Sequence, residues 1–225
     1  MKIPTLLSAG SLLALGAAGA VGVMTLAGAG PRATTTQATT ATPTYTPVAY
    51  AAESASAKSY VVDGVHSGVV FRIMHAGAAP FYGMFTSLSG TMTVDTQNPA
   101  ATTMTMEIDT SKVATGNNNR DDHLRSADFF NARQFPTATF TSTGARASGD
   151  GSMAIDGELT LLGVTKPVTA TVTPTGEGQF RDSMRAGFEA TLTFNRSDFG
   201  MTAYIDQGTL GDEVRLTVFI EGIEQ

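Results

Sequence analysis

Residues 117–130, NNNRDDHLRSADFF, gather charged side chains and one of the chain's three histidines between runs rich in Thr, Val, Met and Phe. Asn117, Asn119 and Asp121 stand at the first, third and fifth positions of a calcium-loop spacing. A calcium loop also needs glycine at its sixth position, where this chain has Asp122. We therefore do not interpret the segment as a calcium site.

The same segment has the features of a helix start. An asparagine among residues 117–119 can cap the first turn. Asp121 and Asp122 follow at once, and their charges complement the positive end of a helix dipole. We therefore predict one short helix here, whose charges chiefly serve to begin it. The apolar side chains that we expect on one face of this helix are Leu124, Ala127 and Phe130.

The three histidines could form a metal site only if distant parts of the chain converge. His66 and His75 are nine residues apart, so along a regular strand they would point to opposite faces. Neither they nor His123 has an acidic residue at a metal-motif offset such as H-E-x-x-H. We predict no metal site and interpret them as hydrogen-bonded or surface histidines, leaving open a role in holding the polar end of a ligand.

No other pattern predicts catalysis or a cofactor. The segment GVHSG, residues 64–68, has histidine where a G-x-S-x-G nucleophile turn needs serine, and it precedes a strand rather than a helix. Phosphate-binding and dinucleotide-binding glycine patterns are absent from the sequence, as is a recognisable acid/base pair of carboxylates. The lack of cysteine excludes thiolate catalysis, disulfides and iron–sulfur clusters. We predict that the protein is not an enzyme.

Charge argues against a nucleic-acid partner. From Tyr60 onward the chain carries eleven basic and nineteen acidic residues, without a basic cluster. Binding to a phosphate backbone depends on such clusters. We therefore exclude nucleic acid as a ligand.

The first sixty residues differ in composition from the rest. Residues 5–29 follow Lys2 without a charge and predict an export signal, either cleaved or retained as a membrane anchor. Residues 31–59 are rich in Thr, Ala and Pro and predict a disordered linker. All twelve Phe lie at Phe71 or later. We expect a signal or anchor over 1–30, a linker over 31–59 and one folded domain over 60–225, in a periplasmic or secreted protein.

The folded part reads as an all-β domain. Thr or charged residues alternate with Met, Val, Ala, Leu or Phe, which is typical of strands with one buried face. Eight or nine such strands include residues 91–95, 103–109, 137–143, 168–173, 188–194 and 212–225. Gly, Asn and Asp predict turns between antiparallel neighbours at residues 95–99, 148–152 and 175–179. Periodicity alone leaves a sandwich and a closed barrel equally open.

Several motifs follow one another in a fixed order between Tyr60 and about Gly222. They are Asp63, His66, Ser67, Phe71 and His75, then Gly83, Phe85 and Gly90, then Arg120, His123, Leu124, Ser126, Asp128, Phe129 and Phe130, and finally the segments GELTLLGVTKPV and NRSDFGM. In this order they resemble the YceI-like family, also called the lipid- or polyisoprenoid-binding YceI domain. The family often has tryptophan at the start of its first strand, where this chain has Tyr60, and this departure bears on the shape of one barrel end and on ligand preference.

The resemblance implies an eight-stranded antiparallel barrel of lipocalin-like shape with one short helix. Its apolar interior would bind or transport a long-chain isoprenoid or related amphiphile without catalysis. A homodimer, and association with a membrane through the N-terminal segment, are left open. The residues that fit a ligand-binding interior are Phe71, Phe85, Met92, Met104, Met106, Phe129, Phe130, Phe140, Phe188, Leu192 and Phe194.

Two other functions remain open from the sequence. One is an enzyme that acts on an isoprenoid lipid or quinone. The other is a structural adaptor whose barrel is filled by side chains. An interior space large enough for a lipid chain would count against the adaptor.

Overall fold

The computed structural model describes residues 57–225. The predicted signal or anchor and most of the predicted linker lie outside the described residues, although the linker's last residues, Lys58 and Ser59, already belong to the first strand. The strands are β1 (Lys58–Val62), β2 (Gly68–His75), β3 (Ala79–Phe85), β4 (Leu88–Val94), β5 (Thr103–Asp109), β6 (Val113–Ala114), β7 (Thr137–Ala147), β8 (Met153–Leu161), β9 (Val164–Phe180), β10 (Ser183–Asn195) and β11 (Leu210–Glu224). The helix α1 spans Asn118–Arg125, and 3-10 turns span Pro99–Ala101, Thr110–Lys112 and Arg196–Phe199.

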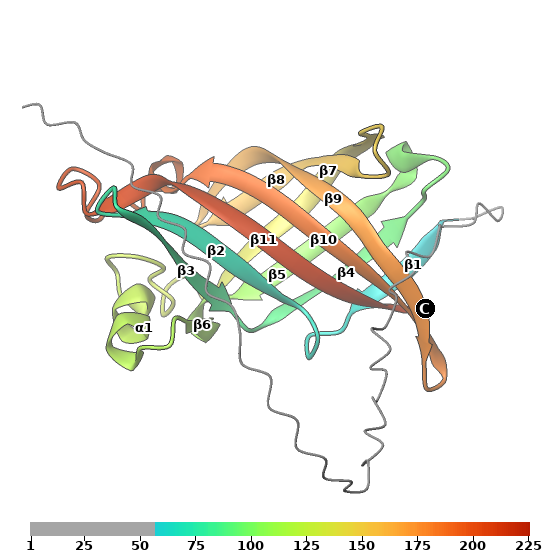
Figure 1. Ribbon diagram of the computed structural model, residues 1–225, viewed down its shortest axis with the longest axis horizontal. Helices are drawn as coiled ribbons and strands as arrows, with labels where there is room; N and C mark the ends of the chain where they lie inside the picture. Colours follow the sequence, from blue (N-terminus) through green and yellow to red (C-terminus); the bar gives the residue numbers. More distant parts are fainter. Residues whose placement is uncertain (1–56) are drawn as a thin grey trace, which may run out of the picture. The chain divides into compact units, whose positions relative to one another are not determined.

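Eight antiparallel strands close into a barrel, which confirms the predicted fold (Figure 1). The ring runs β1-β4-β5-β7-β8-β9-β10-β11 and returns to β1. Closure depends on β11, which pairs with β10 along its length and with β1 through Gly222 to Glu224. Closing the sheet leaves no unpaired edge around this part of the barrel.

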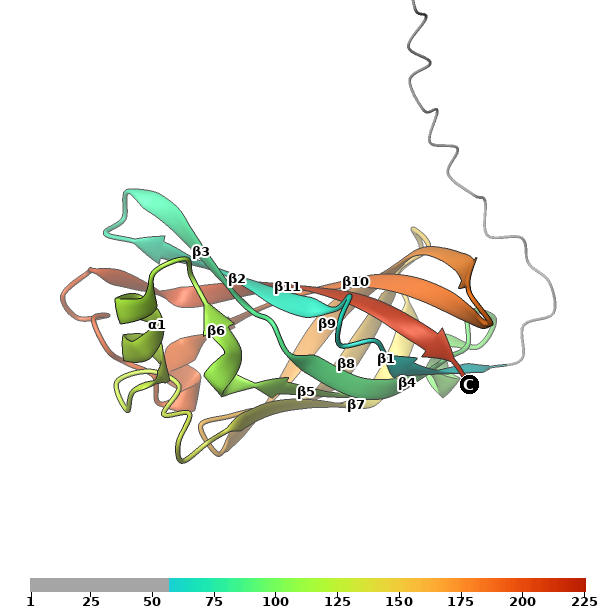
Figure 2. The ribbon, with the colours of Figure 1, turned by 90° about the horizontal axis from the view of Figure 1, so that it is seen from below.

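At the other end the sheet is extended but not closed. The earlier part of β11 pairs with β2, which pairs with β3, which in turn pairs with the two-residue β6. β6 does not pair with β7. Residues 115–136 connect these two strands, and α1 lies beside β6 at this end (Figure 2). Side chains and loops, not backbone pairing, therefore complete the barrel wall here.

The predicted turn at residues 175–179 is wrong, because these residues lie within β9. Gly187 of β10 pairs with Gly176, but the next residue, Phe188, pairs with Pro174, so Thr175 is the extra residue of a β-bulge. The chain reverses instead at Arg181, which has a positive φ of 54°. Gly176 thus adjoins a bulge, and Gly178 lies in the regular ladder opposite Arg185, so neither forms a turn.

The helix begins where we predicted and ends earlier. The Asn117 side chain accepts a hydrogen bond from the Arg120 amide at 3.1 Å, as expected of a helix cap. The helix stops at Arg125, so the predicted apolar face is wrong: Ala127 is exposed and outside the helix. Leu124 and Phe130 do pack against the core. Among residues 57–225, no helix has the length and hydrophobicity needed to cross a membrane.

The barrel interior is filled along most of its length. One core cluster fills the closed end around Tyr60, Met92, Met104, Met106 and Phe188 and continues along the barrel to Phe71 and Phe85. A second cluster contains Phe129, Ala138, Leu159, Leu161, Phe199 and Met201. The two clusters share partly buried neighbours that include Ile108, Leu124 and Phe194, so the core is continuous.

Gly90 in β4 is a position where any side chain should destabilise the barrel. It has a φ of 153°, and an added Cβ would lie 2.2 Å from the Thr105 carbonyl oxygen of β5. We expect Gly90→Ala to lower the free energy of unfolding by about 2–4 kcal/mol, through backbone strain and overpacking. Denaturant unfolding would measure the change.

Gly144→Ala is the matched control, because an added Cβ at Gly144 of β7 would meet nothing within 4 Å. Equal losses in the two variants would contradict the packing argument.

Candidate functional site

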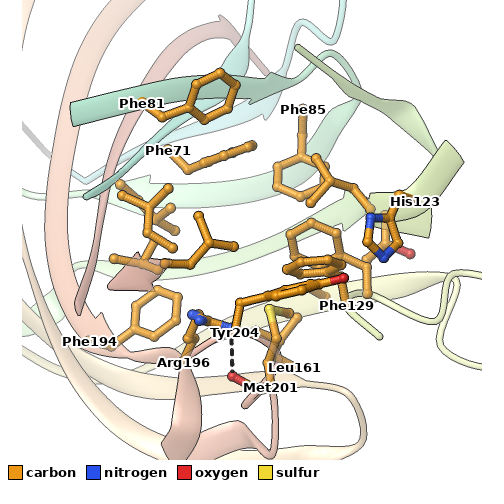
Figure 3. A pocket seen from close by; sticks show the side chains of 18 of the residues that line it. Phe71, Phe81, Phe85, His123, Phe129, Leu161, Phe194, Arg196, Met201 and Tyr204 are labelled. Atoms are coloured by element: carbon orange, nitrogen blue, oxygen red, sulfur yellow. Dashed lines mark hydrogen bonds between the residues drawn. The ribbon is translucent and has the colours of Figure 1, made fainter. Parts of the chain in front are cut away.

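A cavity of about 330 Å³ lies at the end of the barrel that α1 covers (Figure 3). Its walls come from β2, β3, β5, β7, β8, β10 and β11, from α1 and from the loop before β11. The lining is mostly apolar: Phe71, Ile73, Phe81, Phe85, Ile108, Leu124, Phe129, Phe130, Ala138, Leu159, Leu161, Phe194, Met201, Tyr204, Leu210, Val214 and Leu216. The barrel therefore encloses an apolar space as well as a packed core.

Aromatic rings shape the wall near α1. Phe130 meets Phe85 edge to face, with ring centroids 5.0 Å apart, and Phe85 in turn lies 5.9 Å from Phe71. Phe129 stacks on Tyr204 at 6.1 Å, and His123 contacts both of those rings (Figure 3). These contacts join the segment after α1 to β3 and to the loop before β11. The rings thus cover the part of the wall that lacks backbone pairing.

Five of the eleven predicted interior residues line this cavity: Phe71, Phe85, Phe129, Phe130 and Phe194. The other six do not line it but belong to, or pack against, the larger core cluster: Met92, Met104, Met106, Phe140, Phe188 and Leu192. The alternating pattern identified the inward face of each strand. It could not say how far along the barrel each side chain lies.

The sequence analysis missed most of the lining. Ile73 and Ile108 lie on the same faces as the predicted Phe71 and Met106, two residues further along β2 and β5. Following the two-residue alternation one step further along each strand would have identified both isoleucines. Met201 and Tyr204 come from a loop that has no period. Met201 ends the motif NRSDFGM, whereas no sequence signal marked Tyr204.

Arg196 is a buried cation beside the cavity. Its guanidinium donates hydrogen bonds to three backbone carbonyls, those of Gly211 at 2.8 Å, Met201 at 3.0 Å and Ala203 at 2.7 Å. Burial lowers its pKa, which the nearby Asp212 partly opposes. Because the carbonyls take these donors, Arg196 fixes the loop that forms one wall.

The three histidines do not converge. His75 and His123 line the cavity, whereas His66 lies between β1 and β2, next to Asp63 and Glu221. Asp63, His66 and Glu221 are the one group of potential metal ligands within the described residues. Arg185 donates to both carboxylates, at 2.6 Å and 3.1 Å, so its guanidinium already supplies positive charge there. The arrangement is a salt-bridge network that joins β10 and β11 to the β1–β2 turn.

The comparisons with known proteins agree with this architecture. The YceI-like domain pattern matches residues 60–222. Protein YceI of Escherichia coli O6:H1 is 43% identical over 185 residues, which make up 81% of this chain and 95% of that protein. The chain belongs to the YceI-like family.

Solved structures show the same YceI-like fold. Burkholderia cenocepacia BcnA aligns with a TM-score of 0.65 and 26% identity, covering 71% of this chain and 98% of BcnA. A polyisoprenoid binding domain from Saccharophagus degradans, implicated in plant cell wall breakdown, aligns with a TM-score of 0.55 and 17% identity, covering 74% of this chain and 98% of that domain.

In this YceI-like domain the motif residues divide between the two ends of the barrel. Asp63, His66 and Ser67 stabilise the closed end, where the Ser67 hydroxyl accepts a hydrogen bond from the Glu221 amide at 2.9 Å. Arg120, His123, Phe129 and Phe130 stand at the cavity. The start of the first motif therefore supports the barrel, whereas its Phe71 and His75 line the cavity together with residues of the second motif.

Asp63 should make the stability of the domain depend on pH in the acid range. Hydrogen bonds from His66, from the Val65 amide and from Arg185 lower its pKa from 3.8 to about 2. The unfolded chain would bind the proton first, so the stabilisation is fully present above pH 3.8 and is lost as pH falls toward 2. We expect Asp63→Asn to flatten the fall in unfolding free energy across this range.

Denaturant unfolding at several pH values would measure this effect. Asp182→Asn is the control, because Asp182 lies in the exposed β9–β10 turn. If the native protein and Asp63→Asn lose stability in parallel between pH 3.8 and pH 2, the Asp63 carboxylate does not cause the loss.

Proposed function

We propose that this protein binds, and thereby sequesters or transports, a single-chain amphiphilic lipid such as an isoprenoid, without catalysing a reaction. The observation that carries the proposal is the apolar cavity of about 330 Å³ inside the barrel. A barrel that served only as a structural adaptor would have no need of such a space. The cavity lining suits a hydrocarbon chain, whose binding removes apolar surface from water.

The size of the cavity indicates how much of a chain it holds. If a methylene group takes about the 30 Å³ share of a water molecule, the cavity of about 330 Å³ holds on the order of eleven carbon groups. That is roughly two isoprene units, whose burial at about 0.8 kcal/mol per carbon group yields about 8 kcal/mol gross. This gain must offset an association cost of about 4–15 kcal/mol. The carbon groups of a longer chain would add to the gain only if the side chains at the inner end of the cavity, its floor, moved aside.

The comparisons support the proposed class of ligand. One structure of the same fold is described as a polyisoprenoid binding domain. The cavity of the present chain is compatible with the end of such a chain. Native mass spectrometry of gently purified protein, followed by organic extraction, would identify what it carries, and turnover of that molecule by the protein would contradict a noncatalytic role.

We also propose that the protein works outside the cytoplasm, in the periplasm or after secretion. The uncharged residues 5–29 motivate this proposal. Cell fractionation would test it, and native protein in the cytosol with an intact N-terminus would contradict it.

Filling the cavity should weaken lipid binding. Ala138 of β7 is a small lining residue, and Ala138→Leu would occupy space that a ligand chain needs. Loss of about two carbon groups of burial should weaken binding of a C10–C12 chain by about tenfold, measured by displacement of an apolar fluorescent dye.

Ala154→Leu is the matched control, because Ala154 lies on β8 between the inward-facing Met153 and Ile155 and does not line the cavity. Equal affinity in the native protein and Ala138→Leu would show that the chain binds elsewhere.

Shortening the side chain that forms the floor of the cavity should change the length of the lipid chain that binds best. Met106 lies two residues from the cavity-lining Ile108 on β5, and it pairs with Phe140 of β7. Met106→Ala should extend the cavity toward the closed end and shift the best-bound chain to a longer one. The cost in unfolding free energy should be about 2–5 kcal/mol.

Met153→Ala is the control, because Met153 is equally a buried methionine but contacts Thr102 away from the cavity. Affinities for C10, C15 and C20 prenols would measure the preference. An unchanged ranking in Met106→Ala would mean that Met106 does not form the floor.

A further inference from the structure

Apart from the phenol of Tyr204, the titratable residues that line the cavity are all basic: His75, Arg120, His123 and Arg196. No carboxylate lines it, although acidic residues outnumber basic ones by nineteen to eleven from residue 60 onward. The charge at the cavity is therefore opposite in sign to that of the domain. A neutral lipid gives no reason for such a distribution.

Arg120 is held in a fixed position at the cavity. Its Nε donates to the Thr115 hydroxyl at 2.8 Å, and its Nη2 donates to the Thr115 carbonyl at 2.9 Å. Its guanidinium lies 4.5 Å from the centre of the Phe81 ring of β3, at a distance typical of cation–π contacts. Thr115 is fixed in turn by the buried Asp121, which accepts bonds from the Thr115 amide and hydroxyl. The cation is thus preorganised.

Part of this guanidinium has no acceptor in the protein. Within residues 57–225, Nη1 of Arg120 makes no hydrogen bond or ion pair, whereas Arg196 donates from Nε and both terminal nitrogens to carbonyls. Arg120 also stands in the first turn of α1, where a positive charge opposes the helix dipole. This placement does not help the helix, so stability of α1 does not explain it.

The two histidines differ in their availability. His123 Nε2 lies 2.9 Å from Asp128 Oδ2, and the Asp128 side chain is 62% exposed. The His75 side chain, exposed at the end of β2, has no hydrogen-bond partner among the described residues. An anion at the cavity could therefore use Arg120 and His75 without displacing Asp128.

We infer that the polar end of the ligand is an anion, a carboxylate or a phosphate monoester, held at the cavity by Arg120 with help from His75. This inference rests on the proposed lipid-binding function and specifies the class of lipid. A guanidinium forms stronger hydrogen bonds with carboxylate and phosphate oxygens than with an alcohol or a quinone oxygen. The apolar walls would supply affinity for the chain, and Arg120 would select its head group.

Two matched pairs of ligands test the inference: dodecanoate against dodecanol, and farnesyl monophosphate against farnesol. Within each pair the chain is the same, so the ratio of dissociation constants reports the head group. Displacement of a neutral apolar dye from the full chain would measure each constant. We expect the anion to bind about tenfold or more tightly than the alcohol.

Arg120→Gln should reduce this ratio to about one in at least one pair while the affinity for the alcohol stays within about twofold. Arg133→Gln is the matched control, because it removes the same charge from an exposed residue that does not line the cavity. His75→Gln should lower the ratio in part, and it leaves the bonds between Arg120 and Thr115 intact. If Arg120→Gln binds the dye more weakly than the native protein, the substitution has damaged the cavity. The ratio of dissociation constants in His75→Gln would then be the test of the inference.

The outcomes separate this inference from the proposed function. Equal binding of anion and alcohol by the native protein in both pairs would overturn the anionic head group and leave lipid binding in place. An unchanged ratio in both Arg120→Gln and His75→Gln would also overturn it. If neither anion nor alcohol displaces the dye, the lipid-binding function itself fails. Preference in only the carboxylate pair or only the phosphate pair would support the inference and identify the source.

Discussion

The structure depends on how β11 pairs with three other strands. It pairs with β10 throughout, with β1 at its last residues and with β2 before them. The short β1 closes the ring at one end, whereas β2 and β3 continue the sheet without closing it at the other. Because the backbone satisfies its own hydrogen bonds only where strands pair, the incomplete end needs other elements. The segment containing α1 meets that need, and the cavity lies behind it.

The two ends use charge differently. At the closed end, Asp63, His66, Arg185 and Glu221 pair with one another and bind the β1–β2 turn to the wall, although the buried Nε of Arg185 has no hydrogen-bond partner among the described residues. At the cavity end no carboxylate lines the apolar space, and within residues 57–225 neither Nη1 of Arg120 nor the His75 side chain has a hydrogen-bond partner. A network in which opposite charges pair gives stability, whereas a cation with unused hydrogen-bonding capacity beside an apolar space is suited to recognition.

The sequence predicted most of the fold because its signals are local. The residues of β5 alternate so regularly that its predicted bounds, 103–109, are those of the structure, and the Asn117 cap marked the start of α1. The bulge of β9 was mistaken for a turn because glycine serves both, and the choice depends on the partner strand.

The cavity was harder to predict. Side chains such as Met106 and Phe71 share an inward orientation, but only the packing of the whole barrel decides which one meets empty space. Tyr204 and Met201 reach the cavity from a loop whose course is set by Arg196, a contact that local sequence does not encode.

The carbonyl contacts of Arg196 also bear on how fast a bound molecule exchanges. Moving the loop before β11 outward would take two of its three carbonyl acceptors from the buried Arg196 guanidinium, which is costly. That wall should therefore stay in place. The segment around α1 is joined to the barrel by ring contacts and by Arg125, whose guanidinium donates to the Ser111 and Val113 carbonyls. The Arg125 side chain is 35% exposed, so water can replace those bonds and this segment offers the less costly opening. The residence time of a bound molecule would then depend on how often residues 115–136 open locally. The same segment would both cover the interior and set the rate at which the bound molecule leaves.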